Sequence, residues 1–322
     1  MSSIPGSDCA GAVACRTILA SSVANVYTSE IKKSIEELGR KPKLVGFLAN
    51  ADPAARMYAE WTGKTCVEIG FMFELREVDK EELEDYIVLA NEDDDVDGIM
   101  IYFPVFGNRQ DQYLQQVVSK DKDVEGLSHI YIQNLYHNVR YLDDAKTQKS
   151  ILPCTPLALV KILEYLGVYN MILPYGNRLY GKTITIVNRS EIVGRPLAAL
   201  LANDGAVVYS FDIDSVQKFT RGEGIRLRSH RVSDVEVKLE DIAVMSDVII
   251  TGVPSENYKF ETNYIKDGAV CVNFSTAKNF SPDVKTKSSL YVPSVGKVTV
   301  TMLMRNLLRL ITNKSSRKFE LN

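Results

Sequence analysis

Residues 181–201 read GKTITIVNRSEIVGRPLAALL, and this stretch decides the fold. Its first part, residues 183–187, is β-branched and has no polar face, which predicts a parallel strand covered on both sides. Residues 188–190 break that pattern. From Ile192 the apolar residues recur at helical spacing, and Pro196 is tolerated because it falls in the first turn. The stretch is therefore predicted to form a strand, a tight loop and a helix.

The loop at residues 188–193 is the predicted anion site. Unpaired backbone N–H groups and the positive end of the helix converge there, which suits a pyrophosphate. A second strand is predicted at residues 206–211, and Asp212 follows it, placed to bind the adenosine ribose and to repel a 2′-phosphate. This favours NAD over NADP. Only Gly194 stands where the dinucleotide fingerprint has three glycines, so a strand-loop-helix unit that binds nothing stays open.

Length and charge restrict the class of protein. A chain of 322 residues is long enough for two domains with cores of their own. A net charge of −3 argues against a nucleic acid or an anionic membrane as partner. No apolar run approaches a membrane span, and the first residues carry no convincing secretory or mitochondrial signal. We expect a cytoplasmic protein with neither nucleic-acid nor membrane partners.

The cysteines and histidines do not suggest a metal. The five cysteines are odd in number and lack the short paired spacings of metal sites, so they are expected to be reduced and independent. The three histidines offer no ligand cluster either. No metal site is predicted. The cysteines are Cys9, Cys15, Cys66, Cys154 and Cys271.

The first part of the chain alternates helices and strands, which indicates an α/β layer with a parallel sheet. Asp79 and Glu82 have the spacing of a capping box, which predicts that a helix opens there and runs to Leu89. The other predicted helices are residues 30–38, residues 53–61 and an amphipathic segment at 112–118. The predicted strands are residues 43–49, 66–75 and 96–102.

The second part of the chain repeats this alternation around the opening stretch. Thr155 is predicted as an N-cap with Pro156 at the first helical position, and the helix would run to about Leu166 and connect two domains. Residues 215–240 are charged and predict a solvated insertion; the alternative is a 2′-phosphate site, which Asp212 opposes. Two more buried strands are predicted at 248–251 and 270–274, and a final helix at 299–310.

Six separated motifs occur in an order typical of one family. They are DPAARMY at 52–58, DGIMI at 97–101, KDVEG at 122–126, PCTP at 153–156, NRSEIVG at 188–194 and VGKVTVTML at 295–303. With them, the chain resembles the methylenetetrahydrofolate dehydrogenase/cyclohydrolase family along most of its length, and most closely the monofunctional NAD-dependent fungal members.

The resemblance implies an α/β fold with two domains and a cleft between them. It implies a folate-binding catalytic domain of residues 1–150 plus 304–322 and a Rossmann-type, parallel-sheet NAD-binding domain of residues 151–303. The implied reaction is NAD-dependent oxidation of 5,10-methylenetetrahydrofolate to 5,10-methenyltetrahydrofolate, in one-carbon supply to purine synthesis, by a homodimer. Another two-domain Rossmann dehydrogenase of amino-acid or shikimate type, or a nucleotide-sensing module without turnover, stays an alternative.

The resemblance also implies roles for single residues. Tyr58 and Cys154 would be catalytic, with Tyr58 offering its ring to the folate and Cys154 easily ionised at a positive helix end. The alternatives are an ordinary helix-face aromatic and a small residue packed near the cofactor. Glu125 would bind the amino-pyrimidine edge of the pterin, or be a simple turn residue. The implied substrate contacts are Tyr58, Tyr102, Glu125 and Pro293. The implied cofactor contacts are Thr155, Asn188, Arg189, Ser190, Val193, Asp212, Ile213, Gly252, Val253 and Pro254.

Three positions depart from the family pattern. Members that hydrolyse the methenyl product have a lysine where this chain has Thr62, and Lys64 would lie about 200° round the helix from it. Tyr102 stands where a glutamine is usual, and Glu125 where an aspartate is usual. Hydride loss from a methylene between two nitrogens leaves a cation and removes no proton, so a lysine is dispensable for it. The sequence therefore predicts a dehydrogenase without useful cyclohydrolase activity.

Overall fold

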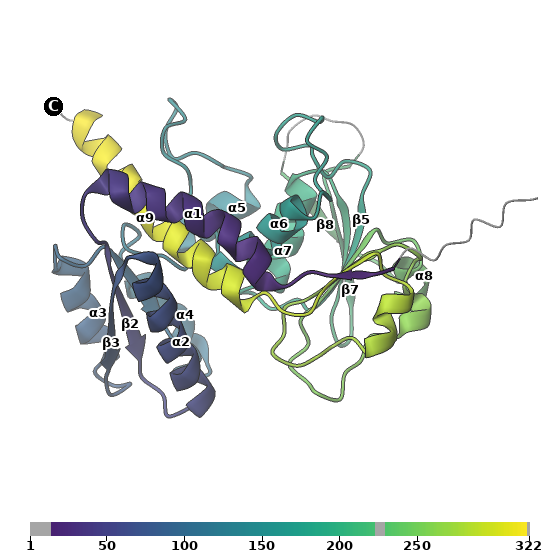
Figure 1. Cartoon of the computed structure of the whole chain (residues 1–322), viewed down its shortest axis with the longest axis horizontal. Coiled ribbons are helices and arrows are strands. Elements are labelled where there is room, and N and C mark those ends of the chain that lie inside the picture. Colours follow the sequence, from purple (N-terminus) through teal and green to yellow (C-terminus); the bar gives the residue numbers. More distant parts are fainter. Residues whose placement is uncertain (1–13, 223–228, 321–322) are drawn as a thin grey trace, which may run out of the picture.

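A computed structural model describes residues 14–222 and 229–320 of the chain (Figure 1). It contains a three-stranded and an eight-stranded sheet with helices packed around both, so the predicted α/β class is confirmed. Cys9, Arg226 and Arg228 lie outside the described residues. None of the helices in the described ranges has the length and apolar character needed to cross a bilayer.

The smaller sheet is parallel, with strand order β3-β2-β4. Its strands are β2 (Lys43–Leu48), β3 (Met72–Glu77) and β4 (Gly98–Ile101). The helices of this part of the chain are α2 (Pro53–Ile69), α3 (Leu83–Glu92), α4 (Arg109–Val117) and α5 (His129–Tyr136). Apolar clusters cover both faces of the sheet, since Leu44 belongs to one cluster and Val45 to the other. The predicted buried strand at 43–49 is thus confirmed.

The predicted strand at 66–75 is wrong in its first half. Helix α2 continues to Ile69 and ends at Gly70, whose left-handed φ of 117° closes the last turn. Cys66 and Ile69 are buried on one face of that helix, three residues apart, so their apolar character reflects helical burial. The strand begins only at Met72.

Some helix starts differ from the predicted ones. The Asp79 carboxylate accepts the N–H of Glu81 at 2.9 Å, but this closes a turn, and α3 begins at Leu83. The predicted capping box is therefore wrong. Helix α4 begins at Arg109, because the Asn108 side chain accepts the N–H of Gln110. Helix α5 was not predicted.

The larger sheet has the strand order β1-β11-β10-β9-β5-β6-β7-β8. It is parallel except at one edge, where β7 pairs antiparallel with both β6 and β8. Its strands are β1 (Arg16–Thr17), β5 (Thr183–Val187), β6 (Val207–Phe211), β7 (Val216–Thr220), β8 (Arg231–Asp234), β9 (Val248–Thr251), β10 (Val270–Asn273) and β11 (Leu290–Val292). Helices α7 (Gly194–Asn203) and α8 (Leu239–Ala243) and two short 3₁₀ turns, Thr262–Tyr264 and Pro282–Thr286, connect them. The opening stretch forms β5, a loop and α7, as predicted.

The predicted solvated insertion at 215–240 is wrong at β7, whereas all four residues of β8 are exposed; residues 223–228 of this range lie outside the described residues. Strands β7 and β8 extend the sheet there, and Phe219 is fully buried. Arg221 is buried as well, and its guanidinium donates to the carbonyl of Gly176 and the side chain of Asn177. The apolar residues of β7, Val216 and Phe219, are three positions apart, so this edge hairpin lacks the period-two pattern that predicts a strand.

Two long helices, α1 (Ala20–Leu38) and α9 (Gly296–Glu320), lie side by side across both sheets (Figure 1). Each contributes to both apolar cores. Val23 of α1 and Met302 of α9 pack in the core of the larger sheet, whereas Ile31 and Leu307 pack in that of the smaller sheet. The predicted domain boundaries stay a prediction, with β1 at residues 16–17 joining the larger sheet.

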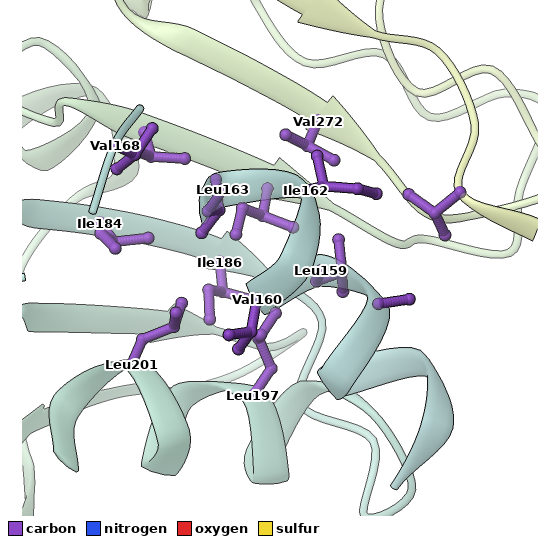
Figure 2. Close-up of a cluster of buried hydrophobic side chains, with 14 of the residues drawn as sticks. Leu159, Val160, Ile162, Leu163, Val168, Ile184, Ile186, Leu197, Leu201 and Val272 are labelled. Atoms are coloured by element: carbon purple, nitrogen blue, oxygen red, sulfur yellow. The ribbon is translucent and has the colours of Figure 1, made fainter. Parts of the chain in front are cut away.

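Helix α6 (Cys154–Tyr165) joins the two parts of the chain. Its apolar side chains meet those of β5 and α7 in a single cluster, shown in Figure 2. At its start, the side-chain amide of Asn306 on α9 donates to the carbonyls of Val124 and Leu152, each at 2.9 Å. The side chain of Asn306 is buried, and it links the backbone just before Glu125 to the backbone just before Pro153 and Cys154.

Candidate active site

Tyr58 stands on α2 near its N-terminus. The helix begins there because the Asp52 carboxylate accepts the N–H of Ala54 at 2.9 Å and Pro53 occupies the first helical position. The ring of Tyr58 meets the ring of Tyr102 edge-on, with 6.1 Å between centroids. Tyr58 remains 37% exposed, so part of the residue is accessible. Burial around its hydroxyl raises the pKa of Tyr58.

Tyr102 follows β4 at the carboxyl edge of the smaller sheet. Asn50 fixes this corner, because its amide donates to the carbonyls of Tyr102 and Pro104 across the cis Phe103–Pro104 bond. The Tyr102 ring is buried, which raises the pKa of Tyr102; the neighbouring hydroxyl of Thr62 opposes that shift. At hydrogen-bonding geometry, however, the buried Tyr102 hydroxyl has no partner among the described residues.

Glu125 lies in a turn that other residues hold rigid. The Asp123 carboxylate accepts the N–H groups of Gly126 and Ser128 at 2.8 and 2.7 Å. The Lys122 ammonium donates to the carbonyls of Ala90 and Asp93, which directs it away from Glu125. Lys122 and Asp123 are therefore structural, and Glu125 is the acid that faces Tyr58 and Cys154.

Burial dominates the electrostatics of Glu125. It raises the pKa of Glu125 to about 8, although the N–H of Ile101 donates to the carboxylate at 3.0 Å and favours the ionised form. The buried Asp123 adds to the upward shift. Near neutral pH this side chain can hold or release a proton with little cost.

Cys154 is not the easily ionised thiol that the sequence suggested. Helix α6 begins at Cys154 with Pro153 as N-cap, so Thr155 is inside the first turn and is not the N-cap. Burial, with the charge of Glu125 second, raises the pKa of Cys154 to about 12, while Thr155 opposes this shift. Burial outweighs the positive helix end, and the thiol is neutral at physiological pH.

The loop after β5 is shaped by Asn188. Its side-chain oxygen accepts from the N–H and hydroxyl of Ser190 at 2.9 and 2.7 Å, and its amide donates to the carbonyl of Gly252 at 2.9 Å. The Ser190 hydroxyl accepts from the N–H of Gly194 at 3.2 Å and, at 3.4 Å, from that of Val193, at the start of α7. The loop therefore turns tightly against the end of β9.

Two glycines allow this close approach. A Cβ added at Gly194 would lie 2.3 Å from the backbone oxygen of Asn188, and one added at Gly252 would lie 1.9 Å from the ring of Phe274. Helix α7 begins at Gly194, two residues later than predicted. One glycine suffices where the fingerprint has three, because Asn188 and Ser190 hold the rest of the turn.

Arg189 points away from the loop. Its side chain is 6% exposed and lies at the end of β6, where its guanidinium contacts the carbonyl of Ser210, both the carbonyl and the hydroxyl of Ser215, and the Asp212 carboxylate at 3.5 Å. Asp212 itself is 47% exposed, and Ile213 is 93% exposed. The bidentate contact of Arg189 with a pyrophosphate has no support in this arrangement; the side chain instead positions Asp212.

The remaining predicted positions lie at the carboxyl ends of β9 and β11, at the same edge of the sheet as Asn188. Val253 and Pro293 are half-buried there, and Pro254 is exposed. Sequence reasoning missed the side chains that hold this edge: Asn279 donates to and accepts from the backbone of Val253, and Asn273 donates to the carbonyl of Pro293. No local pattern marks these two asparagines, because Asn273 is the last residue of β10 and Asn279 lies in the segment beyond it.

The structure thus gathers the predicted residues in two groups. Tyr58, Tyr102, Glu125 and Cys154 influence one another electrostatically beside the smaller sheet. The loops after β5, β6, β9 and β11 meet along one edge of the larger sheet, where doubly wound sheets bind dinucleotides. In the described part of the chain, no three His, Cys, Asp or Glu side chains gather as a metal ion would require, and the absence of a metal stays a prediction.

Fold and site together define a class: a two-domain α/β protein in which an aromatic and acidic group accompanies a Rossmann-type dinucleotide unit. Comparisons with known proteins agree. Residues 18–125 match the family model for the tetrahydrofolate dehydrogenase/cyclohydrolase catalytic domain, and residues 153–225 match that for its NAD(P)-binding domain. The chain belongs to the tetrahydrofolate dehydrogenase/cyclohydrolase family.

Several relatives are similar over nearly their whole length. The methylenetetrahydrofolate dehydrogenase [NAD(+)] of Schizosaccharomyces pombe is 67% identical, covering 92% of this chain and 93% of its own. That of Saccharomyces cerevisiae is 64% identical, covering 92% and 96%. The solved NAD-dependent 5,10-methylenetetrahydrofolate dehydrogenase of Saccharomyces cerevisiae superposes with a TM-score of 0.90 at 62% identity, covering 95% of this chain and 99% of that one.

The raised pKa of Glu125 predicts a pH-dependent stability. Because the folded protein holds the proton more tightly than the unfolded chain, Glu125 contributes fully below the ordinary glutamate pKa of 4.5, and this contribution is lost as pH rises towards about 8. Glu125→Gln should therefore gain stability relative to wild type between pH 5 and 8, by at most about 1.4 kcal/mol per pH unit. Denaturant unfolding at several pH values measures the difference. The exposed Glu81→Gln is the control, and a constant difference for Glu125→Gln would contradict the prediction.

Proposed function

We propose that this protein oxidises 5,10-methylenetetrahydrofolate to 5,10-methenyltetrahydrofolate with NAD⁺ in one-carbon metabolism. The observation that carries the proposal is the 67% identity over 92% of the chain with a methylenetetrahydrofolate dehydrogenase [NAD(+)]. Such a relation does not favour a dehydrogenase of amino-acid or shikimate type, nor a sensing module without turnover. We extend the proposal to the predicted domain boundaries, a cytoplasmic location and a homodimer, which family analogy supports.

The cofactor loop fits a dinucleotide. The backbone N–H groups of Glu191 and Ile192 have no hydrogen-bond partner among the residues described, and both residues are exposed at the start of α7. Gly194 lets the start of α7 pack closely on Asn188, since any side chain there would strike Asn188. Bound NAD⁺ would supply the hydride acceptor. Asn188, Ser190 and Val193 would hold its pyrophosphate, Asp212 and Ile213 its adenosine, and Thr155 and residues 252–254 its nicotinamide half.

The folate group fits a reaction that develops positive charge. The accessible ring of Tyr58 would stack on the flat folate rings, with Tyr102 and Pro293 as further contacts. Glu125 would accept hydrogen bonds from the amino-pyrimidine edge, and binding would favour its ionised form. Cys154 remains neutral and packs beside the reacting atoms. The Lys122 ammonium would not oppose the cation, because it is bound to the carbonyls of Ala90 and Asp93.

Turnover is the first test. Adding the protein to methylenetetrahydrofolate and NAD⁺ should produce methenyl absorbance and NADH together. Gly194→Ala should lower kcat/KM for NAD⁺ at least about tenfold, since its Cβ would lie 2.3 Å from the Asn188 oxygen. Gly296→Ala, whose Cβ meets nothing within 4 Å, is the matched control. Absence of methenyl formation with either dinucleotide would reject the function.

Cofactor choice should depend on Asp212. Its carboxylate would repel a 2′-phosphate, and it also neutralises Arg189, the cation available at this end of β6. Asp212→Ser should raise kcat/KM for NADP⁺ relative to NAD⁺ by about tenfold or more, corresponding to about 1.4 kcal/mol. The neighbouring exposed Asp214→Ser is the control and should change the ratio little. A wild-type preference for NADP⁺ would refute this reading.

Cyclohydrolase activity should be absent. Thr62 is fully buried, and its hydroxyl donates to the carbonyl of Tyr58 at 2.8 Å, so it cannot activate water. Lys64 is exposed on another face of α2 and cannot replace the missing lysine. Supplied methenyltetrahydrofolate should decay at its spontaneous rate with the protein present, and Thr62→Lys should leave hydride transfer unchanged or slower. An enzyme-dependent decay comparable with the dehydrogenase rate, lost in Lys64→Met, would contradict this assignment.

A further inference from the structure

A cavity of about 180 Å³ lies among α5, α6, α9 and the segments that follow α5 and α6. Helix α6 packs against α9, and Figure 1 shows α5 near both. No residue assigned above to folate or NAD lines this cavity, so it is separate from the proposed active site. Its polar lining residues are Asn134, Asn138, Arg140, Lys149, Ser150, Lys161, Glu164, Tyr169, Tyr175, Arg178, Asp204, Arg305, Asn306 and Arg309.

Cations outnumber acids in this lining. Six Lys or Arg residues stand against Glu164 and Asp204. Both acids are already paired, because Asp204 accepts from Arg140 at 2.7 Å and Glu164 from Lys161 at 2.6 Å. Asp204 also accepts the hydroxyl of Tyr169 at 3.0 Å. The lining carboxylates are therefore committed to partners, and positive charge is left over.

The surplus charge gathers at α9 and the segment before α6. Arg305 reaches the exposed Glu30 at 3.3 Å through one nitrogen, but its Nε is buried and has no hydrogen-bond partner among the described residues. Lys149 and Arg309 make no ion pair within the described ranges. A buried N–H donor without an acceptor lowers the stability of the fold, and it indicates that a hydrogen-bond acceptor is missing from the cavity.

These cations also repel one another. Burial lowers the pKa of Lys149, and the charges of Arg309, Arg305 and Lys161 lower it further. The pKa of Arg309 is lowered by burial and then by Arg305, while Glu30 and Tyr141 oppose the shift. The opposing groups do not neutralise the cluster. An anion that entered the cavity would convert this repulsion into attraction.

We propose that this cavity is a binding site for a phosphate-class anion, a phosphate or pyrophosphate group carried by a small molecule or free in solution. Lys149, Arg305 and Arg309 would form its main contacts, since guanidinium groups match phosphate oxygens in pairs. Asn134 and Ser150, which hydrogen-bond to each other at 3.2 Å, stand in the same lining as neutral donors. The cavity's volume of about 180 Å³ leaves room for one such group.

The site is connected to the catalytic segments through Asn306. This residue lines the cavity, and its amide holds the carbonyls of Val124 and Leu152, next to Glu125 and Pro153. Leu152 itself lines the cavity. A bound anion would therefore restrain the last helix at the point where it fixes the active-site segments.

Calorimetric titration of the full-length protein with inorganic pyrophosphate tests the site. The titration is run at low ionic strength, and chloride keeps the ionic strength equal in all samples. It is repeated with and without saturating NAD⁺. NAD⁺ should leave pyrophosphate binding intact, because the two sites share no residue. The double variant Lys149→Gln with Arg309→Gln should weaken binding at least about tenfold, as expected for loss of charge-assisted hydrogen bonds. Removing the same charge from α1, with Lys32→Gln and Lys33→Gln, is the matched control and should change affinity less than about threefold.

Three results would overturn the proposal: no binding at millimolar pyrophosphate, displacement by NAD⁺, or equal weakening in both double variants. Displacement would place pyrophosphate in the cofactor loop, and equal weakening would mean attraction by net charge alone. Thermal melting shows that the variants fold. Without anion, the Lys149 and Arg309 double variant should melt no lower than wild type, because its mutual repulsion is relieved. If that variant fails to fold, Lys149→Gln alone, at the exposed rim, replaces it in the same titration.

Discussion

Burial of helix α9 in two cores at once is the constraint on which the rest of the molecule depends. Positions two apart on a helix point about 200° apart, so Val298 enters the core of the larger sheet and Val300 that of the smaller one. Each fully buried aliphatic side chain contributes about 1.5–3 kcal/mol, and α9 supplies several to each core. Asn306 adds direction to this packing by holding two carbonyls beside Glu125 and Cys154. The active-site segments are therefore positioned by the end of the chain.

The same burial sets the chemistry of the folate side. Glu125 and Cys154 both have raised pKa values because they are removed from water, and the charge of Glu125 raises the pKa of Cys154 further. A cation that develops between two folate nitrogens would lie near the neutral thiol of Cys154. It would also lie near the carboxyl group of Glu125, which can lose its proton near neutral pH. A buried lysine at position 62 would reverse that balance. The threonine found there is uncharged, and its hydroxyl donates to the backbone carbonyl of Tyr58.

Sequence reasoning succeeded where one local signal decides the outcome. The β-branched run of β5 and the apolar run of β2 have no competing pattern, and both strands were predicted correctly. It failed where tertiary burial overrides local pattern. Residues 66–69 look extended but are helical, with Cys66 and Ile69 on the buried face of α2, and the charged hairpin of β7 and β8 hides Phe219 in the core. The ionisation of Cys154 was misjudged for the same reason, because a helix end is visible in sequence and desolvation is not. Asn279 and Asn306 act through distant backbone groups, which no local spacing reveals.

Arg189 shows how a motif residue changes its role with its neighbours. An arginine in the loop after β5 suggests contact with a phosphate. Here, however, the side chain extends to the end of β6 and contacts Asp212 and Ser215. The guanidinium is buried, and an uncompensated cation there would attract an additional phosphate on the ribose. Asp212 supplies the compensating charge while its own carboxylate stays half exposed towards the place where a ribose would lie. Without Asp212, the Arg189 cation would be uncompensated and would favour a phosphorylated ribose, whereas Asp212 alone would still repel one. The proposed preference for an unphosphorylated ribose therefore depends on Asp212, which also compensates the charge of Arg189.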